Sequence, residues 1–340
     1  MNGGGTLADT FVHASVPWQR HLAEAVRDVS ELWRLLDLPV EDLPAAREAA
    51  KRFPLMVPRS YLRRITPGNR QDPLLAQVLP LAAELEDVPG FTADPLAEGG
   101  CSPVPGLLHK YQGRALLVST AACAIHCRYC FRRHYPYQDV PRRGPWWEPA
   151  MAYLRAHPEV DELLLSGGDP LTLPDAILEG ILSDAEAIPT LRRLRFHTRM
   201  PVVLPERIDA GFIRLLTSRR LPVVMVLHVN HPQEMDAQVT EVCARLRGAG
   251  VTLLNQSVLL KGINDEAGIL ADLSRSLFDA GVLPYYLHVL DRVAGAAHFL
   301  RDDTDALRLH GELAARLPGY LVPRLVREEP GAPGKTPLTD

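Results

Sequence analysis

From residue 114 onward, short apolar runs alternate with amphipathic stretches, and this alternation constrains the fold more than any other feature of the sequence. Six runs read as strands: RALLVST, DELLLSG, LRFHTRM, PVVMVLHVN, VTLLNQSVLL and LPYYLHVLD. The stretches between them read as helices: WEPAMAYLRAHP, LPDAILEGILSDAEAI, IDAGFIRLLTSRR, MDAQVTEVCARLRGAG and DEAGILADLSRSLFDAGV. Because parallel strands need a helical crossover, the pattern predicts βαβ units and a parallel sheet. Either an open doubly wound sheet or a full or partial barrel fits this α/β pattern.

Polar residues gather where the predicted strands end. The six runs lead into a cysteine-rich segment, SGGDP, HTRMP, HVNHP, NQS and LDR, in that order. In barrels of parallel strands the working groups collect at the carboxyl ends of the strands. The sequence therefore favours a barrel-like arrangement with a functional site at that end.

The chain before the alternation reads as helices broken by prolines. Residues 18–38 and 42–53 have apolar side chains at helical spacing, and proline-rich connectors follow them. We therefore expect three parts. A mainly helical region covers residues 1–113, a barrel covers 114–300, and a short extension covers 301–340.

Composition argues against two classes of partner. The chain of 340 residues has a formal net charge of −4, which is unsuited to a general electrostatic grip on nucleic acid. No apolar run approaches the roughly 18 residues that span a bilayer. The N-terminus lacks the basic start and the apolar core of a signal peptide. We expect a soluble, cytoplasmic protein without a nucleic-acid or membrane partner.

The five cysteines are too few and too clustered for a disulfide framework. Cys123, Cys127 and Cys130 lie within ACAIHCRYCF, directly after the first predicted strand. Cys243 shares a helical face with apolar residues, which predicts a buried position. Cys101 lies in a loop rich in glycine and proline and receives no role. The clustered cysteines point to metal or redox chemistry.

Three thiols leave a tetrahedral metal one ligand short, and three interpretations follow. A structural zinc site could take His126 or His134 as its fourth ligand, although no second Cys/His pair of zinc-site spacing follows in the sequence. The thiols could also be plain reduced side chains. Alternatively, an iron–sulfur cluster with three protein thiolates would keep one iron free to bind a substrate or cofactor.

The cysteine run resembles the signature of the radical S-adenosylmethionine (SAM) enzymes. Its spacing is C-x3-C-x2-C, with an aromatic residue, Tyr129, just before the last cysteine. Gly167, Gly168 and Asp169 follow the second predicted strand and match the turn with which family members hold the methionyl amine of SAM. Glycines permit that close backbone approach. The resemblance implies a [4Fe–4S] cluster whose open iron chelates SAM, in a partial (β/α)6 TIM-like barrel of the radical SAM type.

Longer strings resemble one family, the lysine 2,3-aminomutases. They span residues 60 to 338 and include SPVPGLLHKYQGRALL, CRYCFRR, RMPVVLPERI, HVNHPQE, NQSVLLKGIND, LPYYLHVLD and PGAPGKTPL. The resemblance implies three cofactors: a [4Fe–4S] cluster, SAM and pyridoxal 5′-phosphate (PLP). It also implies an isomerase that moves the amino group of L-lysine from C2 to C3, and a reducing electron donor of the flavodoxin or ferredoxin kind.

On this resemblance, the cofactor sites fall on particular residues. Lys335 in GKTPL matches the lysine that forms a Schiff base with PLP, a role that requires an amine. Without the resemblance it would read as a solvated tail lysine. Lys110 and Arg114 match the cations that hold the cofactor phosphate, and His228 and Gln256 match positions that line the SAM site. A charged loop and hydrogen-bonded polar residues at strand ends are the alternatives for these four.

The substrate contacts follow from the same resemblance. Arg132 matches the arginine that pairs with the substrate carboxylate, a role suited to its bidentate fork. Asp291 matches an aspartate that binds the distal amine of lysine. The second amine-binding aspartate of the family falls on Glu328, beside Glu329, so a longer carboxylate stands there. Two carboxylates suit an ammonium and repel an acidic side chain, which argues against glutamate as the substrate.

Within the family, the chain most resembles a short subgroup. It ends soon after GKTPL, whereas long catabolic members carry a further segment with zinc-binding cysteines. The short members make β-lysine for the modification of translation elongation factor P, together with a lysyl-transferring ligase. A catabolic or biosynthetic enzyme that acts on free lysine or another amino acid is one alternative. A non-catalytic module that holds zinc through its cysteines is another.

Overall fold

The computed structural model describes residues 17–140 and 144–339. In this part of the chain, nine strands form one sheet in the order β1-β2-β3-β4-β5-β6-β7-β8-β9. The strands from β2 to β8 run parallel, and β1 and β9 are antiparallel edge strands. The prediction that the N-terminus is not a signal peptide falls largely on residues 1–16, which lie outside the described residues.

All six predicted strands are confirmed, and the predicted parallel sheet with them. They are β2 (Arg114–Thr120), β3 (Glu162–Gly167), β4 (Arg193–Thr198), β5 (Val223–Leu227), β6 (Thr252–Val258) and β7 (Leu283–His288). The sheet has more strands than predicted: β1 (Leu107–Tyr111), β8 (Arg324–Arg327) and β9 (Thr336–Pro337) extend it at its edges. These three are short or highly charged, so their periodicity is too weak to mark them in the sequence.

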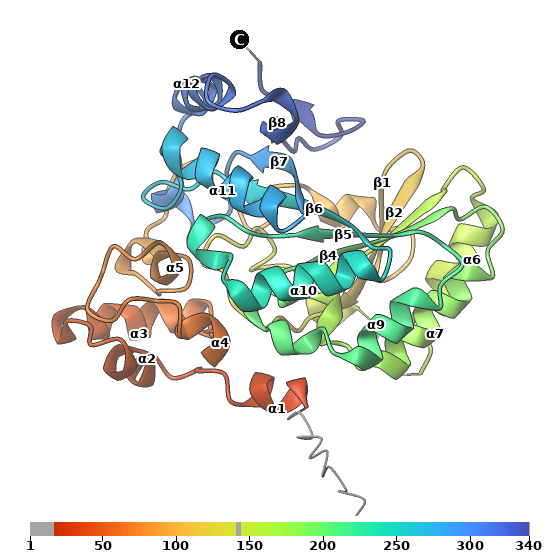
Figure 1. Cartoon of the computed structure of the whole chain (residues 1–340), viewed down its shortest axis with the longest axis horizontal. Coiled ribbons are helices and arrows are strands. Elements are labelled where there is room, and N and C mark those ends of the chain that lie inside the picture. Colours follow the sequence, from red (N-terminus) through yellow and green to blue (C-terminus); the bar gives the residue numbers. More distant parts are fainter. Residues whose placement is uncertain (1–16, 141–143, 340) are drawn as a thin grey trace, which may run out of the picture.

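Each predicted crossover helix is also confirmed. They are α6 (Glu148–Ala156), α7 (Asp175–Glu186), α9 (Ala210–Thr217), α10 (Ala237–Gly248) and α11 (Ala267–Asp279), and α12 (Asp303–Ala314) follows the barrel. In Figure 1, α7, α9 and α10 lie together on one side of the strands. Cys243 is fully buried in α10, as predicted.

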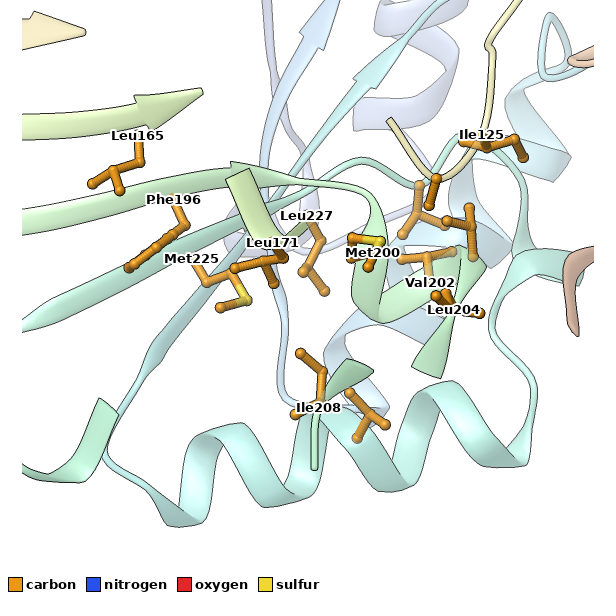
Figure 2. Packing of buried hydrophobic residues seen from close by; sticks show 14 of the residues in the cluster. Ile125, Leu165, Leu171, Phe196, Met200, Val202, Leu204, Ile208, Met225 and Leu227 are labelled. Atoms are coloured by element: carbon orange, nitrogen blue, oxygen red, sulfur yellow. The ribbon is translucent and has the colours of Figure 1, made fainter. Parts of the chain in front are cut away.

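The strands have two different faces, and this division positions the site. Side chains such as Phe196 and Met225 point away from the barrel interior and pack with Leu171 in the layer next to the helices (Figure 2). The alternate residues, Arg195 in β4 and Gln256 in β6 among them, line a cavity on the other face. Because residues from β2 through β7 all line that one cavity, the sheet curves around it as a partial barrel.

The N-terminal region is mainly helical but differs from the sequence expectation in one place. Its helices are α1 (Trp18–Ala23), α2 (Val29–Leu35), α3 (Leu43–Arg52), α4 (Arg59–Leu62) and α5 (Pro73–Ala76). The periodic stretch 18–38 is therefore two helices. The chain breaks because Val26 pairs with Val57 through backbone hydrogen bonds, and because Asp28 caps α2 by accepting from Glu31 N at 2.8 Å.

No helix in residues 17–140 and 144–339 is both long and apolar enough to cross a bilayer. The boundaries proposed after residues 113 and 300 remain predictions, although β1, in the first part, pairs with β2, in the second.

Candidate active site

A cavity of about 720 Å³ lies on the inner face of the sheet. This volume is typical of a site for a small molecule or cofactor. Every residue that the sequence assigned to a cofactor or to the substrate lines it: Lys110, Arg114, Cys123, Cys127, Cys130, Arg132, Gly167, Gly168, Asp169, His228, Gln256, Asp291, Glu328 and Lys335. The fold thus brings Lys110 of the first strand together with Glu328 and Lys335 of the connection between the last two strands.

The segment that follows β2 carries the three cysteines into the cavity wall. Burial and the neighbouring thiol of Cys130 raise the pKa of Cys123, and burial and Cys127 raise the pKa of Cys130 to about 11. Thiols that affect one another in this way lie close together. Among the described residues, no group of three or more His, Cys, Asp or Glu side chains is placed so that it could hold a single metal ion. The thiols are gathered on one wall without forming a tetrahedral set.

Both histidines considered as zinc ligands contact backbone carbonyls instead. His126 Nδ1 lies 2.8 Å from the carbonyl oxygen of Pro54, and its ring stacks on Phe53 with the centroids 5.3 Å apart. His134 Nε2 lies 3.2 Å from the carbonyl oxygen of Ala294. These contacts give each ring a structural role that needs no metal.

The glycine turn after β3 packs directly on the backbone that leads to the cysteines. Gly167 has a φ of +115°, and a Cβ there would lie 2.7 Å from Thr120 O. A Cβ on Gly168 would lie 2.3 Å from Ala122 O. Hydrogen bonds of 2.7 Å from Gly168 N to Thr120 O and from Asp169 N to Ala122 O join the two segments. Only glycine fits this approach, so the turn and the cysteine segment form one continuous wall.

We expect Gly168→Ala to destabilise the fold by about 1–3 kcal/mol, because the new Cβ would push the backbone of residues 121–122 out of place. Gly311→Ala in α12 is the matched control. Nothing lies within 4 Å of that Cβ position, and alanine should stabilise the helix interior by about 0.5–1 kcal/mol. Urea unfolding of both variants measures the difference. A Gly168→Ala protein as stable as the wild type would contradict the close packing.

The side chain of Asp169 anchors the turn. Its carboxylate accepts hydrogen bonds from Thr198 Oγ1 (2.7 Å), Arg199 N (2.7 Å), Leu171 N (3.0 Å) and Met200 N (3.1 Å). Burial raises the pKa of Asp169, and these hydrogen bonds oppose that effect. The carboxylate therefore ties the end of β3 to the end of β4. It is the backbone of the glycine turn that remains for contact with a bound molecule.

Arg132 is held inside the cavity by residues that the sequence did not single out. Its Nε and Nη2 each donate to the Glu98 carboxylate at 2.8 Å, and Nη1 donates to Ser166 Oγ at 3.1 Å. Burial lowers the pKa of Arg132, but the charge and hydrogen bonds of Glu98 outweigh burial and keep the guanidinium protonated. An incoming carboxylate would meet an arginine whose orientation is fixed, with the Nη1 side toward Ser166.

Glu328 joins two lysines into an arrangement that we call the Glu328 clasp. Lys110 Nζ, from β1, lies 2.6 Å from Glu328 Oε1, and Lys335 Nζ donates to Oε2 of the same carboxylate. Burial alone would raise the pKa of Glu328, but the two ammonium charges lower it well below its usual range. The hairpin of β8 and β9 brings Lys335 back to the cavity, where its side chain is only 18% exposed. Lys335 is therefore not a solvated tail lysine.

Asp291 lies three residues beyond β7, close to the clasp. Burial and the negative charge of Glu328 raise the pKa of Asp291 to about 7, against the opposing charges of Lys335 and Lys110. A buried carboxylate beside a second one gains stability when a cation binds between them. The pair is therefore suited to an ammonium group.

Two cations lie on the β1–β2 hairpin. Lys110 belongs to the clasp, and the guanidinium of Arg114 lies over the ring of Tyr111, 4.3 Å from its centroid. Both side chains line the cavity, so this hairpin presents positive charge to it.

Three histidines form an uncharged part of the wall. His228 Nε2 accepts a hydrogen bond of 3.1 Å from Gln256 Nε2. Burial lowers the pKa of His197, His228 and His288, that of His228 to about 3, so all three are neutral near pH 7. Within the described residues, Nε2 of His197 and Nε2 of His288 have no hydrogen-bond partner. These atoms are available to a molecule in the cavity.

Sequence reasoning missed Glu98, Arg199 and His288. Arg199 Nη1 donates to Cys127 Sγ at 2.8 Å, and the residue lies near the end of the predicted strand LRFHTRM, which was a usable signal. His288 lies near the end of the predicted strand LPYYLHVLD and is the last residue of β7. Glu98 has no such signal, because it reaches Arg132 from a short 3-10 helix (Glu98–Cys101) outside the alternating pattern.

Comparison with known proteins agrees with this geometry. Residues 117–273 match the model of the radical SAM superfamily. The chain is 51% identical over 322 residues, 94% of either chain, to a protein of Escherichia coli (strain K12) described as an L-lysine 2,3-aminomutase. It is 47% identical to a protein of the same description from Haemophilus influenzae, again over 94% of both chains.

One more distant relative carries the same description. A protein from Clostridium subterminale, also described as an L-lysine 2,3-aminomutase, is 36% identical over 94% of this chain and 77% of its own length. A solved radical SAM methyltransferase from Sphaerobacter thermophilus has a TM-score of 0.45 and 17% identity, covering 65% of this chain and 68% of that one. At that level the likeness bears on neither the reaction nor the substrate.

Proposed function

The chain belongs to the lysine 2,3-aminomutase family of the radical SAM superfamily, a family of isomerases, and we propose that it converts L-lysine to β-lysine with a [4Fe–4S] cluster, SAM and PLP. One observation carries the proposal. The cysteine segment, the glycine turn and the Glu328 clasp, which lie far apart in the sequence, line the same cavity. A site that combines a cluster with PLP needs these groups within reach of one substrate.

The cysteine wall fits a cluster held by three thiolates. Cys123, Cys127 and Cys130 lie on one short segment at the cavity wall, where they would hold three irons of a cluster and leave the fourth without a protein ligand. The Gly167–Gly168 turn brings backbone groups beside that wall with no side chain in the way. When bound, the cluster and SAM supply a radical that removes a hydrogen atom from the substrate, after one electron arrives from a flavodoxin-like or ferredoxin-like donor.

The opposite part of the cavity fits PLP. Lys335 offers an amine for covalent attachment, and Lys110 and Arg114 offer two positive charges to the phosphate. The unpartnered Nε2 atoms of His197 and His288 can bond to polar atoms of a bound molecule. When bound, PLP carries the substrate nitrogen between C2 and C3.

The two ends of lysine fit the remaining groups. The Nη1 side of Arg132 faces Ser166 Oγ and suits the substrate carboxylate, while Glu98 prevents the guanidinium from turning away. Asp291 and Glu328 suit the distal ammonium. Binding both ends of lysine holds its C3 in one position. The contribution of the protein to catalysis is this positioning of the substrate.

The charges of the cavity favour lysine over an acidic amino acid. In the clasp, Lys110 and Lys335 neutralise Glu328. Covalent attachment of PLP would take the charge from Lys335, so Glu328 would keep only Lys110 as a cationic partner and would oppose ionisation of Asp291 more strongly. The site then contains an excess of negative charge that an ammonium relieves and that a glutamate side chain would increase.

The KM for lysine should depend on pH through Asp291, whose pKa is about 7 while Lys335 is charged. Covalent attachment of the cofactor to Lys335 would remove one positive charge that lowers this pKa, so the break in the profile should lie at or above pH 7. Below the break the carboxyl is increasingly protonated, and a neutral carboxyl attracts the ammonium less, so KM should rise up to about tenfold per pH unit. Above it the profile should flatten while lysine's side-chain ammonium, with a pKa of about 10.4, stays charged. Asp291→Asn should raise KM and remove the dependence. An unchanged profile in that variant would exclude Asp291 as the titrating group.

The reaction itself is tested by an anaerobic assay. Reconstituted protein is incubated with L-lysine, SAM, PLP and dithionite, and β-lysine is measured by mass spectrometry. We expect β-lysine only when all four are present, and L-glutamate in place of lysine should give no β-amino acid. Absence of β-lysine from protein that carries a cluster and PLP would refute the proposed reaction.

The β-lysine is proposed to serve the modification of translation elongation factor P in the cytoplasm, through a lysyl-transferring ligase. The support for this role is the resemblance of the sequence to the short members of the family, which make β-lysine for this modification. The test is the intact mass of elongation factor P co-expressed with the ligase and with either this protein or its Lys335→Ala variant. A modified mass with both proteins, or with neither, would refute this role while leaving the isomerase reaction standing.

A further inference from the structure

Arg199 is held at the end of β4 by its backbone. Its N–H donates to the carboxylate of Asp169 at 2.7 Å, and so does the N–H of Met200 at 3.1 Å. The side chain of Met200 is fully buried and points into the apolar cluster (Figure 2). The backbone of Arg199 is therefore held in place on both sides of its Cα.

The guanidinium of Arg199 is buried and contacts a cysteine sulfur. Nη1 donates to Cys127 Sγ at 2.8 Å, while Nη2 donates to Glu234 Oε2 at 2.7 Å and to Gln77 Oε1 at 2.5 Å. The residue is only 5% exposed. Charge-assisted hydrogen bonds of this kind are stronger than neutral ones, and more so away from water.

Glu234 is fixed by its own hydrogen bonds. Its Oε1 accepts from Asn230 N (2.9 Å), His231 N (3.1 Å) and Gln77 Nε2 (3.2 Å), and the residue is fully buried. These donors, together with Arg199, lower the pKa of Glu234 against the effect of burial. Arg199 is therefore placed between two negative groups: a buried carboxylate, and the sulfur of Cys127 when it is a thiolate.

The same network reaches the aromatic residue of the cysteine signature. Asn230 Nδ2 donates to Tyr129 Oη at 2.7 Å and to Gln77 Oε1 at 3.1 Å. The Arg199 guanidinium lies 5.8 Å from the centre of the Tyr129 ring. Residues from the N-terminal region, β4, the loop after β5 and the cysteine segment thus meet in one buried cluster around one cysteine.

We propose that Arg199 is a positioning residue that donates a charged N–H to the sulfur of Cys127 and thereby, in opposition to Glu234, sets the reduction potential of the cluster. A one-electron reduction adds negative charge to the cluster. A nearby positive charge and a hydrogen bond to a ligand sulfur stabilise that state and raise the potential, whereas a nearby carboxylate lowers it. The inference rests on the proposed function, because it needs a cluster at the cysteines.

Opposite shifts in two variants test this directly. We expect Arg199→Gln to lower the ratio of reduced to oxidised cluster at a fixed potential by roughly tenfold, equivalent to about 59 mV for one electron. Glu234→Gln should raise the same ratio, because it leaves the positive charge unopposed. The measurement is anaerobic potentiometry with dithionite as the reductant, read by electron paramagnetic resonance of the reduced cluster.

Arg207→Gln is the matched control. Arg207 is also fully buried and paired, donating to Leu171 O and Asp175 Oδ1 at 2.7 Å each, but its hydrogen bonds go to no cysteine. It should cost stability without moving the potential. A general packing defect would shift the reduction potentials of all three variants in the same direction.

The outcomes separate this inference from the proposed function. A wild-type protein that takes up no cluster would refute the proposed function. If the wild type takes up a cluster, the inference alone is overturned when Arg199→Gln and Glu234→Gln leave the reduction potential unchanged or shift it in the same direction. If Arg199→Gln does not fold, Glu234→Gln decides: a raised potential supports the inference, and an unchanged or lowered one overturns it.

Discussion

Replacement of Cys130 by alanine is expected to leave a folded protein that cannot hold an iron–sulfur cluster. Reconstituted anaerobically, it should lack the broad visible absorbance and the iron and sulfide of the wild type, and turnover should fall by roughly three orders of magnitude or more. The reason is that the three thiols lie on one segment and no further cysteine lines the cavity wall described. Two thiolates leave two irons without protein ligands.

Cys101→Ala is the control for this experiment. Cys101 is half-buried, and its Sγ makes only a weak contact with the carbonyl of Ala97 at 3.7 Å. Its replacement should change neither iron content nor turnover. A Cys130→Ala protein that keeps its turnover would contradict the assignment of the cysteine segment to a cluster. So would a Cys130→Ala protein that contains no iron but as much zinc as the wild type.

The sequence predicted the barrel well because its strands are buried on one face by apolar side chains. Phe196 and Met225 face the helices, and this burial gives each strand the periodicity that marks it. The edge strands were missed for the complementary reason. β8 has the sequence RLVR and β9 spans only Thr336–Pro337, so neither carries a long enough pattern.

The site residues were predicted because their motifs are local. The spacing of the three cysteines marks them as a metal or redox segment, whereas Gly168 and the more distant site residues were assigned only through the family resemblance of the strings that contain them. What spacing cannot show is which partners tertiary contacts supply. Glu98 reaches Arg132 from 34 residues away, and Lys110 is separated from Glu328 by 218. These partners became visible only when the sheet brought its two edges to one cavity.

The Glu328 clasp gives Glu328 contacts that the family resemblance did not predict. From the sequence, Glu328 was expected to bind the distal ammonium of lysine, and the structure shows it bound to Lys110 and Lys335. One carboxylate can serve both roles, because Oε2 would be free for the ammonium of the substrate whenever Lys335 held the cofactor. A glutamate reaches farther than an aspartate, which suits a carboxylate with partners on two separate strands.

Lys335→Ala is expected to abolish stable binding of PLP while leaving the fold and the cluster intact. After addition of PLP and desalting, the wild type should keep the visible absorbance of covalently attached cofactor and the variant should lose it, with turnover reduced by roughly three orders of magnitude or more. The fold should survive, because Lys335 precedes a two-residue strand at the sheet edge and Glu328 retains Lys110 as a partner.

Two further variants separate covalent attachment from charge. Lys335→Arg keeps a positive charge near Glu328 but has no amine that can attach the aldehyde, so it should lose PLP as completely as the alanine variant. Lys261→Ala removes an exposed lysine and should keep PLP fully. Retention of PLP by Lys335→Arg after desalting would show that the clasp holds the cofactor by charge alone. Loss in Lys335→Arg with iron content unchanged would place the chemistry on the amine of Lys335, because the clasp charge and the cluster would both still be present.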